Sequence, residues 1–146
     1  MKNADVVATL DDLIQTCHDS EAGFRACAEE RVEQHFKVPF MDRAIDCAAA
    51  SRALQALVVE HGGEPGAGVA PHRRWIDVRQ AISGRDGKTV LDEIERGEDL
   101  ALLSYRNALG RGLPVAIRAV VESQYQRVLR NHALVRLLRD EIPTSP

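Results

Sequence analysis

Four stretches of this 146-residue chain repeat apolar residues at alternating steps of three and four. In the first stretch every place in the series but one is apolar: Val7, Leu10, Ile14, Cys17, Glu21, Phe24 and Ala28. Steps of three and four follow one face of an α-helix, whereas a half-buried strand alternates every second residue. No alternation of useful length occurs. The sequence therefore predicts an all-α fold built from long amphipathic helices.

Prolines and glycines divide this pattern into four long helical segments. We expect helices at about residues 5–36, 40–61, 89–109 and 114–141. Pro39 and Pro114 suit the first turn of a helix, where the missing N–H costs no hydrogen bond. The glycine-rich run 62–66 is expected to end the second helix.

The long connection at residues 62–88 decides the predicted topology. Within it, a short helical pattern around residues 71–84 includes Trp75, Val78 and Ile82. A connection of this length can run along a bundle and return the chain to the same end. Two short turns and one long crossover are the connectivity of ferritin-like four-helix bundles. We therefore predict a single ferritin-like domain over residues 1–146, with a short extra helix in the crossover.

Charge and hydropathy exclude two classes of partner. The net charge is -3, acids and bases are interleaved, and no basic tail or stripe suits a nucleic acid. No apolar run approaches the roughly 18 residues that a membrane span requires. The N-terminal residues carry charges where a signal peptide would be apolar. We expect a cytoplasmic protein with neither a nucleic-acid nor a membrane partner.

The cysteines agree with a reducing compartment. Cys17, Cys27 and Cys47 are odd in number and include no Cys-x-x-Cys pair. We expect buried thiols that act as small apolar groups.

Three polar residues interrupt the apolar stripes near the middle of the expected bundle, namely Glu21, Glu98 and His132. At about 1.5 Å per residue, Glu21 lies about 24 Å along its helix and His132 about 27 Å along its own. A buried carboxylate without a partner costs several kcal/mol. We therefore expect Glu21 to point inward and to meet a polar group from residues 89–109 or 114–141.

Three interpretations of these interruptions remain open. The two glutamates could pair with Arg52, Arg127 or Tyr105 in a polar layer that fixes the register of the helices. The two glutamates and the histidine could instead bind a metal ion. In the third interpretation the stripe is displaced by one residue and both acids face solvent.

A two-metal site of the ferritin-like kind takes one Glu from each of two helices and a Glu-x-x-His pair from each of the other two. Glu21 and Glu98 occupy the places of the single glutamates. Both pairs are missing, because residues 42–61 contain no Glu-x-x-His and Glu122 is followed three places on by Tyr125. The chain can therefore offer iron or manganese only a degenerate site.

Several blocks resemble a bacterial family of ferritin-like proteins, domain of unknown function 2383. They are "LDDLIQTCHDSEAGFRACAEE", "HGGEP", "HRRWIDVRQAISGRD" and "LDEIERGEDLALLSYRNAL". The resemblance extends from about Leu10 to Asp140. It implies a ferritin-like bundle with a short extra helix, in a family found mostly in proteobacteria, but it implies no activity. Relatives in the broader fold store iron, oxidise it or respond to stress, which is analogy of fold alone.

Two functions follow as hypotheses. The first is a non-enzymatic, stress-linked interaction or scaffold module that forms a homo-oligomer through its helix faces, with no identifiable small-molecule substrate. The alternative is a metal-binding protein with Glu21, Glu98 and His132 as ligands of iron or manganese, which could act as an oxidase of Fe²⁺. The sequence assigns no catalytic or cofactor-binding residue.

Overall fold

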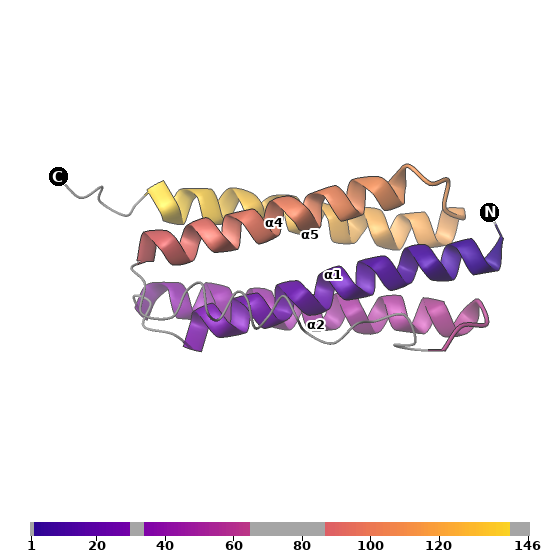
Figure 1. Cartoon of the computed structure of the whole chain (residues 1–146), viewed down its shortest axis with the longest axis horizontal. Coiled ribbons are helices and arrows are strands. Elements are labelled where there is room, and N and C mark those ends of the chain that lie inside the picture. Colours follow the sequence, from indigo (N-terminus) through magenta and orange to yellow (C-terminus); the bar gives the residue numbers. More distant parts are fainter. Residues whose placement is uncertain (1, 30–33, 65–86, 141–146) are drawn as a thin grey trace.

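The computed structural model describes residues 2–29, 34–64 and 87–140, and these residues form a bundle of four α-helices (Figure 1). The helices are α1 (Asn3–Glu29), α2 (Gln34–Glu60), α4 (Gly87–Leu109) and α5 (Val115–Asp140). No strand occurs among the described residues, so the predicted all-α fold class is confirmed. No described helix combines the length and the apolar character that crossing a membrane would require.

Helix directions confirm the predicted crossover. In Figure 1, α1 and α5 run one way, and α2 and α4 run the other way. Helix α1 packs on α2 and α4, and α5 packs on the same two helices, so α2 and α4 lie diagonally across the bundle. Because α2 ends and α4 begins at opposite ends of the bundle, the chain between them must cover its length. The short helix predicted at residues 71–84 lies outside the described residues.

The boundary between the first two helices differs from the prediction. Helix α1 ends at Glu29 and α2 already begins at Gln34, so Pro39 lies inside α2 rather than at its start. Proline is tolerated there because, so close to the N-terminus, it removes a single helical hydrogen bond. The buried rings of Phe36 and Phe40, one turn apart, stack with centroids separated by 6.1 Å and hold this turn in the core.

The glycine-rich run that begins at Gly62 ends α2 where it was expected to do so. At the end of α2, Gly62 has φ of 81° and its N–H donates to Val59 O at 3.1 Å, while the N–H of Gly63 donates to Val58 O at 3.0 Å. These two bonds form a Schellman motif, which needs a residue of positive φ. After α4, Gly112 has φ of 73° and the Arg118 guanidinium donates to Leu109 O.

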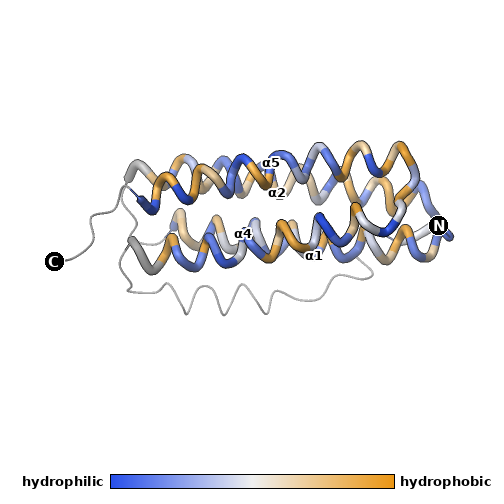
Figure 2. Tube along the Cα trace, turned by 90° about the horizontal axis from the view of Figure 1, so that it is seen from above, coloured by the Kyte–Doolittle hydropathy of each residue, from blue (hydrophilic) through white to orange (hydrophobic). Residues whose placement is uncertain are grey.

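Buried apolar side chains form two clusters, one toward each end of the bundle. Figure 2 shows hydrophobic and hydrophilic residues interleaved along every helix, as amphipathic helices require. The first cluster surrounds Leu10, Leu54 and Ile117, and the second surrounds Phe24, Phe40 and Leu91. Between the clusters lies a polar layer at mid-bundle, where the sequence analysis expected the stripes to be interrupted.

The cysteine prediction is confirmed, since Cys17, Cys27 and Cys47 are buried and free of disulfides. Burial raises the pKa of the Cys17 thiol to about 11 and raises that of Cys47 as well. Both thiols therefore stay protonated at neutral pH.

Replacing glycine by alanine is expected to have opposite effects on the free energy of unfolding at Gly63 and at Gly97. A Cβ on Gly63 would lie 2.7 Å from Val58 Cγ1 and 2.9 Å from Val7 Cγ1, whereas one on Gly97, inside α4, would meet nothing within 4 Å. We expect Gly97→Ala to raise the free energy of unfolding by about 1 kcal/mol through helix propensity. Gly63→Ala should lower it by about 1–2 kcal/mol through overpacking. Urea denaturation of both variants beside wild type measures this, and equal effects would contradict it.

Candidate functional site

The polar layer at mid-bundle contains a charge pair that crosses the core. Glu98 on α4 is 1% exposed, and Arg43 on the diagonal helix α2 is 8% exposed. Arg43 Nε lies 3.9 Å from Glu98 Oε1, which is ion-pair range but beyond hydrogen-bond range. The burial of Glu98 confirms that this polar residue in the apolar stripe of α4 occupies a core position.

Several polar atoms of this layer are buried without a hydrogen-bond partner in the described part of the chain. They are both carboxylate oxygens of Glu98, Arg43 Nε and Asn131 Nδ2. Burial raises the pKa of the Glu98 carboxyl to about 6, and the nearby Arg43, Asn131 and His132 oppose that rise. A buried carboxylate with unused acceptor positions is one that a further donor or cation would stabilise.

A chain of hydrogen bonds beside the charge pair connects all four helices. Cys17 Sγ on α1 lies 3.3 Å from Tyr105 OH on α4, and that hydroxyl donates to Gln124 Oε1 on α5 at 2.9 Å. Gln124 Nε2 then donates to Ala50 O on α2 at 3.3 Å. Burial raises the pKa of Tyr105, so the phenol remains a donor.

Glu21 does not take the predicted position. Its carboxylate accepts a hydrogen bond from Arg25 Nε, one turn along α1, at 3.0 Å, and its side chain is 28% exposed. The prediction of a partner from α4 or α5 is therefore wrong. A glutamate at the edge of the buried face can lie along its own helix and find a cation four residues away.

The candidate partners Arg52, Arg127 and Tyr105 do not bond either glutamate in the described residues, although Tyr105 does belong to the polar layer, through Cys17 and Gln124. Both arginines are exposed. Arg43 takes that role instead. The sequence contained a signal for it, because Arg43 follows Phe40 by three places and precedes Cys47 by four, in the stripe spacing of α2.

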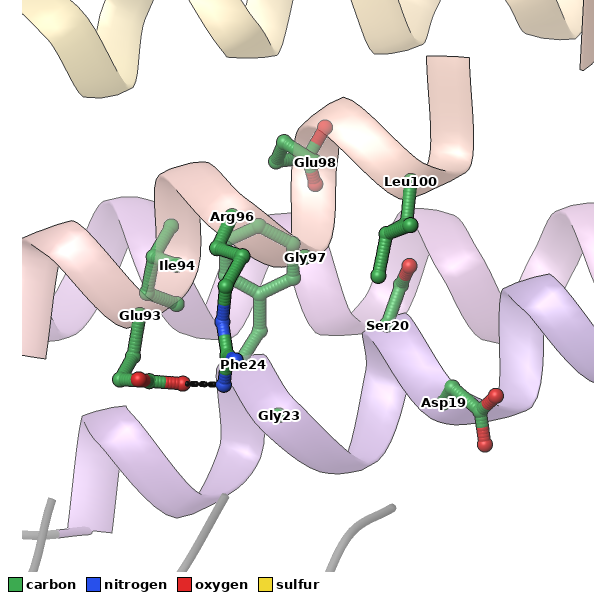
Figure 3. Close-up of a pocket in the computed structure, with 10 residues that line it drawn as sticks. All are labelled: Asp19, Ser20, Gly23, Phe24, Glu93, Ile94, Arg96, Gly97, Glu98 and Leu100. Atoms are coloured by element: carbon green, nitrogen blue, oxygen red, sulfur yellow. Dashed lines mark hydrogen bonds and ion pairs between the residues drawn. The ribbon is translucent and has the colours of Figure 1, made fainter. Parts of the chain in front are cut away.

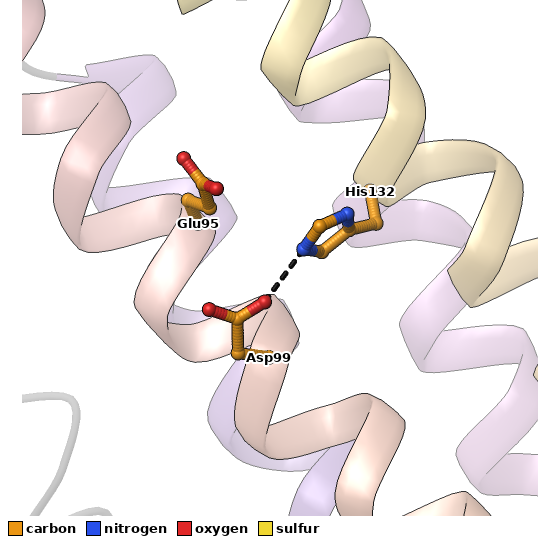
Figure 4. A group of neighbouring side chains, drawn as sticks. All are labelled: Glu95, Asp99 and His132. Atoms are coloured by element: carbon orange, nitrogen blue, oxygen red, sulfur yellow. Dashed lines mark hydrogen bonds and ion pairs between the residues drawn. The ribbon is translucent and has the colours of Figure 1, made fainter.

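His132 belongs to a different cluster from the one predicted. Its Nε2 lies 2.6 Å from Asp99 Oδ1 on α4, and Glu95 lies one turn before Asp99 (Figure 4). The ligand atoms of these three residues lie within 4.8 Å of one another, and among the described residues no other such group occurs. The structure therefore does not bring Glu21, Glu98 and His132 together as one set of ligands.

The cluster formed by Glu95, Asp99 and His132 is tied to α5 by two further cations. Arg136 Nε donates to Glu95 Oε1 at 3.2 Å, and the Arg139 guanidinium binds the other oxygen. A pattern search could have found the cluster, because Glu95 and Asp99 are four apart on α4 and His132 and Arg136 are four apart on α5. Residues four apart share a helix face.

The raised pKa of Glu98 predicts a pH dependence of stability. Because the folded state favours the protonated carboxyl, this contribution to folding is complete below pH 4.5 and is lost as pH rises through about 6. The rise in pKa corresponds to about 2 kcal/mol.

Chemical denaturation of wild type and Glu98→Gln between pH 4 and 7.5, with chelator present, isolates the effect. Wild type should lose about 2 kcal/mol relative to the variant over this range. A difference between the two proteins that is independent of pH would exclude a raised pKa at Glu98.

Comparison with known proteins places the chain by fold and by family. A variant of Dps1 from Mycobacterium smegmatis superposes with a TM-score of 0.80 at 12% identity, covering 94% of this chain and 96% of that one. A dodecameric thioferritin, the bacterioferritin-related protein from Bacteroides fragilis, superposes with a TM-score of 0.71 at 11% identity, covering 98% and 94%. These likenesses show a ferritin-like fold. No curated protein sequence matches.

The family is shown by sequence. Residues 5–111 match the sequence model of the domain of unknown function DUF2383, which covers α1, α2 and α4. The same range contains the Glu98–Arg43 pair as well as Glu95 and Asp99. The chain therefore belongs to the DUF2383 family and has a ferritin-like four-helix fold.

Proposed function

We propose that this chain binds a divalent transition-metal ion between α4 and α5, with Glu95, Asp99 and His132 as its ligands. The observation that carries the proposal is the convergence of two carboxylates and one imidazole within 4.8 Å. Zn²⁺, Mn²⁺ and Fe²⁺ accept these donor types. Ligand bonds of about 2.1 Å place neighbouring donor atoms about 3.4 Å apart, a separation that small side-chain rotations would reach.

Accessibility of the cluster favours metal binding. The Asp99 side chain is 61% exposed and that of His132 is 14% exposed, so the cluster opens to solvent on one side. An ion there can keep water in its remaining coordination positions. Glu95, by contrast, is buried and oriented by Arg136 and Arg139.

The contacts of Glu95 and His132 determine how metal binding should depend on pH and on the neighbouring arginines. Because Arg136 and Arg139 already compensate the charge of Glu95, they compete with a cation for its oxygens. The short contact between His132 Nε2 and Asp99 Oδ1 contains a proton that a metal ion must displace. Binding should therefore release a proton and strengthen with rising pH. The name thioferritin of one structural neighbour fits a metal-binding role, although that likeness is one of fold.

Titration of chelator-treated protein with Zn²⁺ and with Mn²⁺, followed by calorimetry, tests this proposal. We expect one ion to bind per chain. We also expect the heat of binding to vary with the ionisation enthalpy of the buffer, which shows that protons are released. Loss of an imidazole ligand in His132→Ala should weaken binding by at least about tenfold. Arg136→Gln should strengthen it, because a competing cation is removed.

Two matched variants serve as controls for the metal titration. His61→Ala removes an imidazole that bonds Leu57 O, far along α2, and Glu21→Gln alters the residue first expected to be a ligand. Both should bind like wild type. Equal isotherms for His132→Ala and wild type would refute the site.

A second candidate function, self-association, is favoured by the outer face of α2. Val38, Ile45 and Val59 expose 66%, 52% and 54% of their surface. Their separations of 7 and 14 residues place them on one face of the helix. Large apolar side chains aligned in this way mark surfaces that a partner covers. We infer a homo-oligomer that contacts through this face, in keeping with the dodecamer named for the thioferritin.

Ile45→Lys tests the oligomer by placing a charge at the centre of the apolar face. Light scattering after size-exclusion chromatography should show a smaller assembly for this variant than for wild type. Val115→Lys, at an apolar residue that is 87% exposed but lies on α5, should leave the assembly unchanged. A wild-type monomer at high concentration would exclude this function.

A further inference from the structure

A groove between α2 and α5 has no part in the metal site proposed above. Its volume is about 580 Å³, and α2 and α5 are the least closely packed neighbours in the bundle. The walls that the structure describes combine three arginines, two aspartates and a small apolar group. Which of these charges are without a partner decides what the groove can bind.

Arg43 is the buried arginine of the groove, at 8% exposed. Its closest ionic contact runs from Nε to Glu98 Oε1, and that Nε is fully buried. The two terminal nitrogens form no hydrogen bond in the described part of the chain, and they are not among its fully buried polar atoms. Because Arg43 lines the groove, these two nitrogens are the end of the guanidinium that a ligand there can reach.

Two more arginines extend the positive charge along α5. Arg127 and Arg130 are exposed, line the groove and have no ion pair within residues 2–29, 34–64 and 87–140. On the opposite wall, Asp42 and Asp46 of α2 are exposed and also lack an ion pair within those ranges. Three positive charges against two negative ones leave an excess of one positive charge. That excess suits a singly charged anion.

The pocket between α1 and α4 offers no comparable donor (Figure 3). Arg96 lines it but is paired with Glu93, and the carboxylate oxygens of Glu98 are buried in the core. Arginine nitrogens without a partner thus distinguish the groove between α2 and α5. A planar guanidinium donates two parallel hydrogen bonds to a carboxylate, which is a singly charged anion.

The other end of the groove is apolar. Val38 on α2 and Leu134 on α5 line it and are 66% and 41% exposed. Because α2 and α5 run in opposite directions, Val38 lies toward Leu134, while Asp46 lies toward Arg127. Val38 and Arg43 are five residues apart, about 7.5 Å along the helix. A short acyl chain spans that distance.

We propose that the groove between α2 and α5 binds a short-chain monocarboxylate, with its carboxylate on Arg43 and Arg130 and its acyl chain on Val38 and Leu134. Hydrogen bonds between charged partners are stronger than neutral ones, and the burial of Arg43 reduces competition from water. Each methylene that covers the apolar end adds to the affinity. The inference depends on neither proposed function.

Four probes test the proposal: hexanoate, 1-hexanol, hexylammonium and acetate. Each is titrated against the full chain, freed of metal beforehand with chelator, and binding is followed by saturation-transfer NMR of the probe. We expect saturable binding of hexanoate, with a dissociation constant at least about tenfold lower than those of hexanol and acetate, and no saturation with hexylammonium. Equal affinities of hexanoate and any other probe, or no saturable binding, would overturn the proposal.

Variants locate the binding in the groove. Arg130→Gln and Arg43→Lys each remove guanidinium donors and should weaken hexanoate at least about threefold, while Arg43→Lys keeps a charge beside Glu98. Leu134→Ala should weaken hexanoate but leave acetate unchanged. Arg52→Gln removes an exposed arginine of α2 that does not line the groove and should bind like wild type. Wild-type affinity for hexanoate in both Arg130→Gln and Leu134→Ala, at exposed positions, would refute the groove.

Protein concentration separates this site from self-association, because Val38 also belongs to the face inferred for the homo-oligomer. The hexanoate titration is therefore run at a low and at a high protein concentration. A groove formed within one chain predicts the same dissociation constant at both. A constant that changes with protein concentration would assign the site to an interface between copies and overturn the proposal.

Discussion

The charge pair of Glu98 and Arg43 is the constraint around which this bundle is organised. Helices that met only through apolar faces could slide past one another by a helical turn, about 5.4 Å, with modest loss, because leucine and alanine faces are alike at many registers. A slide of that size would take the Glu98 carboxylate away from its guanidinium and into apolar surroundings, at a cost of several kcal/mol. Since the pair joins diagonal helices, it fixes both halves of the bundle together.

Architecture was predictable from the sequence because it depends on period and chain length. Stripe spacing fixes the helices, and the length of the 62–88 connection fixes their directions. The burial of Glu98 was predictable for the same reason. The boundary between α1 and α2 was not predictable. A proline near a helix N-terminus removes a single helical hydrogen bond, so the packing of Phe36 and Phe40 decides where α2 begins.

The partners in the site were less accessible to sequence reasoning. The period of the apolar stripe places a side chain on one face of a helix, but it does not show how far or in which direction a long side chain extends. Arg43 reaches across the core from the stripe of α2, and Glu21 turns along α1 to Arg25. Glu95 and Asp99 lie on α4, and His132 lies on α5. They meet only because of how far α4 and α5 are shifted along each other, and the sequence pattern does not give that shift.

The parallel directions of α1 and α5 also make the bundle a spacer. Helix α1 starts at one end of the bundle and α5 finishes at the other (Figure 1). A helix of 27 residues measures about 40 Å. Anything joined before α1 and anything joined after α5 would be separated by about this length of stiff protein. Joining the two ends directly, as in a circular permutation, would require a linker that traverses the whole bundle.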